Sequence, residues 1–187
     1  MDSTLLFVVC VVVSVFSAKG APMPAAGKMQ YTECKDLSVK LIEMARNLYN
    51  KVESPKIASI IDDAPVSIGP TDTCDPWSLQ NNKETCQSRI IMALKNYTRI
   101  FHKDGVFKNL ACSGWREEAN KISDVTREIL RVLEEPVVNA PLTAVDWYDN
   151  TLCRDSVERL YSFSIISARV FSFLASPVAP MVEMKQC

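Results

Sequence analysis

The stretch LYSFSIISARVFSFLAS, from Leu160 to Ser176, decides the fold that this sequence predicts. Helical residues advance by about 100° each, and at this step one face gathers the residues that we expect to pack inward: Leu160, Phe163, Ser164, Ser167, Phe171 and Leu174. We expect the stretch to be the end of one long helix, from about Asp149 to Ala175.

Arg169 lies on the opposite face of this helix, with Ile165, Ile166 and Phe173 beside it. An amphipathic helix usually keeps large apolar groups off its outer face. Arginine surrounded by apolar side chains is a frequent composition at protein interfaces. The alternative is that Arg169 pairs with a carboxylate of its own chain while its apolar neighbours pack under a loop.

The chain begins with a targeting segment. Leu5 to Phe16 is a short apolar run followed by small residues, which predicts a secretory signal peptide over about residues 1–20, cut between Ser17 and Gly20. A membrane anchor needs roughly 20 apolar residues, more than this run has. With 187 residues, 48% hydrophobic and 23% charged, the rest of the chain, 21–187, suits one secreted domain.

Several classes of function are disfavoured. The formal net charge of −1 gives no electrostatic reason to expect nucleic acid or a membrane as partner. The chain has one histidine, His102, in a polar turn, and no C-x-x-C pair, nucleophile elbow or phosphate loop. We therefore expect no enzymatic activity, no metal site and no cofactor.

Apolar residues at steps of three and four predict three further helices, which with the last one make an all-α protein. Their expected ranges are Tyr31 to Val52, Glu84 to His102 and Trp115 to Glu135. Ala21 to Gln30 is expected to be a mobile leader, and the tail from Ser176 to be extended or disordered. Within the long connection after the first helix, Asp75 can cap a short turn that starts at Pro76.

The connections favour an up-up-down-down four-helix bundle. A helix of about 20 residues is about 30 Å long, and a connection that returns to the starting end must span that distance at no more than roughly 3.6 Å per residue. The first and third connections are long enough to do so, whereas the middle one needs only to make a turn. Long, short and long connections are typical of helical cytokines.

Six cysteines remain after the signal peptide, and they allow 15 full pairings. Cys74 and Cys86 flank a short loop, so we expect them to pair. In the up-up-down-down topology Cys112 and Cys153 share one end of the bundle, and Cys34 and Cys187 share the other, which gives two further pairs. The alternative is that some of these thiols stay free or pair with another chain.

The sequence contains one N-x-S/T sequon, Asn96-Tyr97-Thr98. Asn96 neighbours the apolar stripe of the second helix. Glycosylation is therefore expected only if the site escapes burial.

Two motifs resemble the long-chain helical cytokine family that includes interleukin-6 and the alpha subunits of the interleukin-12 group. One is CDPWSLQNNKETCQSRIIMALKNYTRIF, from Cys74 to Phe101, which is similar to the family's Cys-Asp-Pro loop and the helix after it. The other is SARVF, from Ser167 to Phe171, with Trp147 upstream of Arg169 at the family's spacing. ECKDLSVKL, from Glu33 to Leu41, is a weaker match. The resemblance covers about half of the mature chain.

The resemblance implies roles for two residues. Arg169 would enter an acidic pocket on the shared interleukin-12 beta subunit, with Ile165, Ile166 and Phe173 around it. Trp147 would match the aromatic anchor for the interleukin-23 receptor, while the interleukin-12 receptor beta-1 chain would complete the signalling complex. The alternative for Trp147 is a tryptophan that caps one end of the bundle.

The chain departs from the family pattern in one respect. The family's cysteine for a covalent link to the beta subunit precedes the Cys-Asp-Pro loop, but Ser67 to Thr73 contains no cysteine. Either the heterodimer is non-covalent, or Cys34, Cys112, Cys153 or Cys187 makes the link.

The expected function is therefore that of a secreted cytokine subunit, which pairs with the beta subunit and signals through receptors and Janus kinase–STAT. One alternative is a single-chain interleukin-6-like cytokine without a beta subunit. Another is a secreted carrier of apolar ligands, which would need a cavity inside the bundle.

Overall fold

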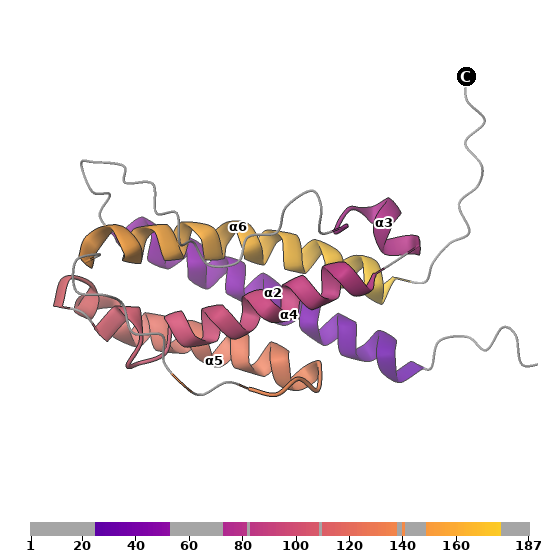
Figure 1. The fold of residues 1–187 in the computed structure, drawn as a ribbon, viewed down its shortest axis with the longest axis horizontal. Helices are drawn as coiled ribbons and strands as arrows, with labels where there is room; N and C mark the ends of the chain where they lie inside the picture. The colour runs from indigo at the N-terminus through magenta and orange to yellow at the C-terminus, as the bar shows by residue number, and fades with distance from the viewer. Residues whose placement is uncertain are drawn as a thin grey trace, which may run out of the picture.

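The computed structural model describes residues 25–52, 73–81, 83–108, 110–137, 140 and 149–176. Four main helices, drawn in Figure 1, account for most of them: α2 (Ala25–Lys51), α4 (Glu84–Ile100), α5 (Arg116–Val132) and α6 (Asp149–Ala175). Shorter elements are α3 (Pro76–Asn81) and two 3-10 helices, η2 (Val106–Lys108) and η3 (Leu110–Trp115). The described residues contain no strand, which agrees with the all-α prediction.

The most extensive helix packing is between α2 and α6, the two longest helices. Tyr31, near the start of α2, stacks on Phe171, near the end of α6, with 6.3 Å between ring centroids. At the other end, the guanidinium of Arg154 donates to the carbonyl oxygen of Tyr49 at 2.7 Å. The two helices therefore run in opposite directions, as Figure 1 also shows.

Small buried residues line the contact between these helices. Ser38 of α2 and Ser164 and Ser167 of α6 are fully buried. The hydroxyls of Ser164 and Ser167 donate back to carbonyl oxygens three residues earlier, at 2.8 and 3.0 Å, so burying them leaves no unsatisfied donor. We infer that these serines let the backbones of α2 and α6 approach closely.

Helix α5 is antiparallel to α2. The ammonium group of Lys51, at the end of α2, lies 3.0 Å from the carboxylate of Glu118, near the start of α5. At the other end, the side-chain amide of Gln30 donates to the carbonyl oxygen of Val132, the last residue of α5. Contacts at both ends therefore fix the direction of α5 relative to α2.

Helix α4 is antiparallel to α5. The hydroxyls of Thr98 and Thr126 lie 3.0 Å apart in the buried contact between these helices, and Lys95 pairs with Glu135, just beyond α5, at 2.8 Å. Helix α4 also packs against α6, where the rings of Tyr97 and Phe163 lie 5.1 Å apart.

One hydrophobic core joins all four main helices. Its largest fully buried side chains are Tyr97, Phe101, Phe107, Phe171, Leu41, Leu48, Ile90, Leu94, Ile122, Ile129, Leu130 and Leu160. The apolar stripes of the sequence therefore face the interior. None of the described helices combines the length and the apolar character that a membrane crossing requires.

One expected boundary is wrong. Helix α2 begins at Ala25 instead of Tyr31, so the part of the expected leader from Ala25 to Gln30 is helical, and its Gln30 is held by the contact with α5. The expected break between the second and third helices is present, and it contains η2 and η3, with Val106 and Phe107 of η2 buried in the core. The other helix ends differ from expectation by three residues or fewer, and α6 has the predicted range.

Two of the three expected disulfides are present. Cys74 is bonded to Cys86, with 5.0 Å between their Cα atoms, and Cys112 is bonded to Cys153, with 6.4 Å. The expected Cys34–Cys187 bond is not formed, because Cys34 has a free thiol that is completely buried in the core. Cys187, like the expected signal peptide and most of the tail, lies outside the described residues.

Candidate docking groove

An open groove of about 630 Å³ lies where α2, α3 and α6 meet. Its lining comes from one face of α2, the first residue of α3 and the outer face of α6: Lys35, Val39, Ile42, Pro76, Ile165, Ala168, Arg169, Ser172, Phe173 and Ser176. We call it the α2/α6 groove. Most of these side chains are apolar, so the groove offers an apolar floor that remains open to solvent.

Arg169 is the most distinctive side chain of the α2/α6 groove. It is exposed, and it forms no ion pair or hydrogen bond with the residues that the structure describes. Lys35 is the other charged residue of the lining, and its ammonium group pairs with Asp36 at 3.2 Å, where both side chains are exposed. The lining contains no carboxylate, so its charge is positive.

The two interpretations of Arg169 can be compared with this geometry. An intramolecular ion pair would need a carboxylate within reach of the guanidinium, and none of the described residues supplies one. The apolar neighbours Ile165 and Phe173 line the same groove as Arg169. An acidic group supplied from outside the chain would therefore meet an arginine that has apolar surfaces beside it.

Ile166 differs from the other three residues expected at this surface. It does not line the groove, although like Phe173 it is half-buried and packs against the hydrophobic core. Its assignment to the partner surface stays a prediction, with its side chain outside the groove.

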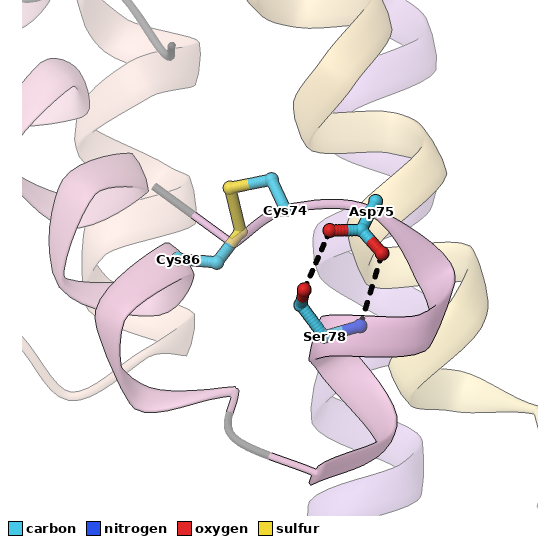
Figure 2. The surroundings of a disulfide bond; sticks show 4 residues. All are labelled: Cys74, Asp75, Ser78 and Cys86. Carbon is cyan, nitrogen blue, oxygen red and sulfur yellow. Dashed lines mark hydrogen bonds between the residues drawn. A yellow bond between two sulfur atoms is a disulfide. The ribbon is translucent and has the colours of Figure 1, made fainter. Parts of the chain in front are cut away.

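Helix α3 contributes its first residue, Pro76, to the groove and is held by its own capping residue. The carboxylate of Asp75 accepts hydrogen bonds from the backbone N–H groups of Trp77 and Ser78, at 3.1 and 3.0 Å, and from the Ser78 hydroxyl at 2.6 Å. Figure 2 shows the two bonds with Ser78. Pro76 occupies the first helical position, where the missing N–H costs nothing. The cap expected from the sequence is therefore present.

These hydrogen bonds favour the ionised form of Asp75. The pKa of its carboxyl is lowered from the usual range, first by the Ser78 hydroxyl and next by the Ser78 backbone N–H. The preceding residue, Cys74, is tied to the start of α4 by its disulfide with Cys86 (Figure 2). The backbone entering α3 is thus fixed by a covalent bond and by a cap, and α3 in turn packs against α6.

The sequence did not indicate the α2 side of the groove. Val39 and Ile42 lie beside the apolar stripe of α2, and Val39 is 44% exposed although it is a large apolar residue. The sequence offered one indication of a binding surface here: these two apolar residues lie next to a stripe that already accounts for the core. Pro76 was expected only as part of the turn, not as part of a binding surface.

Of two other predicted sites, the structure describes one, Asn96, and not the other, Trp147. Trp147 lies outside the described residues, so its proposed receptor contact stays a prediction. Asn96 is half-buried in α4, and the hydroxyl of Thr98, in the same sequon, is fully buried and bonded to the Leu94 carbonyl at 2.8 Å. Thr98 therefore has a structural role whatever the modification state of Asn96.

The buried thiol of Cys34 belongs to the core and not to the groove. Burial, and secondarily the negative charge of Glu33, raises the pKa of Cys34 to about 12. A thiol that stays protonated is a poor nucleophile and a poor metal ligand. Within the part of the chain that the structure describes, no group of three or more histidine, cysteine or acidic residues could hold a metal ion.

Comparison with protein-family models finds none that matches this chain, and a search of curated proteins finds no similar protein.

Proposed function

We propose that this chain is the alpha subunit of a secreted, interleukin-23-like heterodimeric cytokine. In this proposal it pairs with the shared interleukin-12 beta subunit through the α2/α6 groove, and Arg169 enters an acidic pocket of that partner. The complex would then bring together the interleukin-23 receptor, through Trp147, and the interleukin-12 receptor beta-1 chain, and so start Janus kinase–STAT signalling.

The observation on which the proposal chiefly rests is the state of Arg169. The guanidinium is exposed and has no partner among the described residues, in a groove with apolar neighbours and no carboxylate. A bidentate arginine–carboxylate pair in a water-excluded site is directional. Removing one partner of such a pair typically costs about 2–5 kcal/mol of binding, partly because the other charge is left buried and unpaired.

The directions of the helices support an up-up-down-down bundle. Helix α2 is antiparallel to α5 and α6, and α4 is antiparallel to α5, as their paired ends indicate. In addition, the side-chain amide of Gln87, near the start of α4, donates to the hydroxyl of Tyr31, near the start of α2, at 2.7 Å. This arrangement is the one that long-chain helical cytokines use.

Secretion is supported by the two disulfides, because such bonds persist in oxidising compartments. The disulfides also narrow the choices for a covalent link to the beta subunit. Cys112 and Cys153 are bonded to each other, and the Cys34 thiol is inside the core. We therefore propose that the pairing is either non-covalent or made through Cys187.

The proposal is tested by co-expressing the chain with a tagged interleukin-12 beta subunit in secreting cells. Wild-type chain should be co-purified from the medium, whereas Arg169→Glu should not. Arg131→Glu is the matched control, because Arg131 is an exposed arginine of α5 that does not line the groove and that pairs with Glu128, three residues earlier, at 2.7 Å. This variant should pair like the wild type.

The possible results separate the alternatives. If wild type and Arg169→Glu are co-purified in equal amounts, the groove is not the interface. If the wild-type chain is secreted alone and does not bind the beta subunit, the single-chain interleukin-6-like cytokine becomes the better explanation. A non-reducing gel of the complex then tests whether Cys187 forms a covalent link.

A further inference from the structure

Large apolar side chains are exposed at four positions among the described residues: Met29, Val39, Trp77 and Met92. Val39 lines the α2/α6 groove, and Trp77, although not part of the lining, directly follows the lining residue Pro76. Trp77 is 66% exposed. Tryptophan is usually well buried, so an exposed tryptophan beside an apolar groove calls for a physical explanation.

Trp77 does not contribute to the core. Leu79 is the residue through which α3 is buried, and Trp77 precedes it by two positions. At about 100° per residue the two side chains lie about 160° apart around the helix axis. Trp77 therefore projects from α3 into solvent, away from the contact that Leu79 makes.

The backbone of Trp77 is nevertheless held firmly. Its N–H donates to the Asp75 carboxylate at 3.1 Å, and its carbonyl oxygen accepts from the side-chain amide of Asn81 at 3.3 Å. Three residues earlier, the Cys74–Cys86 disulfide attaches the segment to α4 (Figure 2). Binding through a residue whose backbone is already ordered costs little backbone conformational entropy, which favours its use as an interface anchor.

On this basis we infer that Trp77 is a second anchor for the partner that receives Arg169. The two residues provide different chemistry, an indole on α3 and a guanidinium on α6. The partner surface that fits them has an acidic pocket for Arg169 and, next to it, an apolar depression for Trp77. Because the groove is positively charged and apolar, a partner with this combination is complementary in both respects.

This inference rests on the proposed function, since it names a further residue of the same interface. Its test uses the purified secreted chain and the purified interleukin-12 beta subunit, with the dissociation constant measured by biolayer interferometry. Trp77→Ala should weaken binding at least tenfold, because tryptophan is among the most enriched hot-spot residues. Trp77→Phe, which keeps an aromatic ring, should give an intermediate loss.

Met92→Ala is the matched control, because Met92 is a 44% exposed apolar residue of α4 that does not line the groove. It should leave the dissociation constant within about twofold of the wild-type value, as expected for a residue outside the set of hot spots. Thermal unfolding of Trp77→Ala should match that of the wild type, so that lost binding cannot be attributed to lost folding.

The outcomes distinguish this inference from the proposed function. If wild type binds, Arg169→Glu does not, and Trp77→Ala binds as tightly as wild type, then Trp77 is not an anchor and the proposed function stands. If the wild-type chain does not bind the beta subunit at all, the proposed function fails and the inference fails with it.

Discussion

Arg154, near the start of α6, lies over the ring of Tyr49 at the carboxyl end of α2. Its guanidinium carbon is 3.4 Å from the ring centroid. The same guanidinium donates to the carbonyl oxygens of Tyr49 and Val52, at 2.7 and 2.6 Å. The last carbonyl groups of a helix have no partner within the helix. Arg154 satisfies one of them, that of Tyr49, together with the carbonyl of Val52 just after the helix, and places a positive charge at the negative end of the helix dipole.

Arg154→Ala should therefore destabilise the fold. Hydrogen bonds to charged groups contribute about 1.5–3 kcal/mol, so we expect the free energy of unfolding to fall by an amount in that range. Arg154→Lys keeps the charge but loses the planar fork and the stacking on Tyr49, and it should recover only part of the loss. Chemical denaturation followed by circular dichroism measures both. Equal stability of Arg154→Ala and wild type would contradict the role of this contact.

The buried pair of Thr98 and Thr126 makes a separate prediction about the contact between α4 and α5. Thr98→Val leaves the hydroxyl of Thr126 without this neighbour and should cost about 1 kcal/mol of unfolding free energy. The double variant Thr98→Val, Thr126→Val should lose less than the sum of the two single variants, because either single variant already removes the contact between the two hydroxyls. Strictly additive losses in a double-mutant cycle would show that the hydroxyls do not interact.

Much of the fold could be predicted because each helix carries a regular apolar stripe. The stripe of α6 predicted both ends of that helix correctly. The helix faces counted from the sequence also placed Phe163, Ser164 and Ser167 correctly in the interior. The start of α3 could be predicted from chemistry alone, since an aspartate before a proline can cap a helix. Local rules were sufficient in these places.

Other features depend on tertiary contacts that no local rule contains. The first turns of α2 come from a segment rich in alanine, proline and glycine, and the bond from Gln30 to the Val132 carbonyl holds them against α5. Ile166 packs at the edge of the core and outside the groove, whereas Ile165 and Phe173 line it, a difference that a count of helix faces did not show. The α2 side of the groove was missed for the same reason: Val39 and Ile42 become neighbours of Arg169 only after the two helices pack.

The cap of α3 should respond to acid. The pKa of Asp75 is lowered in the folded chain, so its stabilising effect on α3 is complete above the ordinary aspartate pKa of about 3.9 and is lost as the pH falls through the lowered value. Carbon-13 NMR of the side-chain carboxyl should give a titration midpoint below the ordinary value. In Ser78→Ala, which lacks the first of the hydrogen bonds responsible, the midpoint should move back upward. A midpoint at the ordinary value in the wild type would contradict the cap.

Cys34 should be unreactive in the folded protein. Its thiol is buried and its pKa is raised to about 12, so almost no thiolate is present at pH 8. A Cys187→Ser variant leaves Cys34 as the one expected free thiol of the mature chain, and Ellman's reagent should detect it only after denaturation in guanidinium chloride. Cys34→Ala in the same background should release no signal in either condition. Rapid reaction of Cys34 in native buffer would show that this part of the core is open.

The pairing of the chain through the α2/α6 groove is tested most directly by amide hydrogen exchange of the chain with and without the interleukin-12 beta subunit. Exchange should slow in residues 32–43, 75–81 and 165–176, most clearly in α3 and in the last turn of α6, where helix ends open most easily. Exchange in α5 should stay unchanged. Protection centred on α4 and α5, with none in these three segments, would contradict the proposed interface.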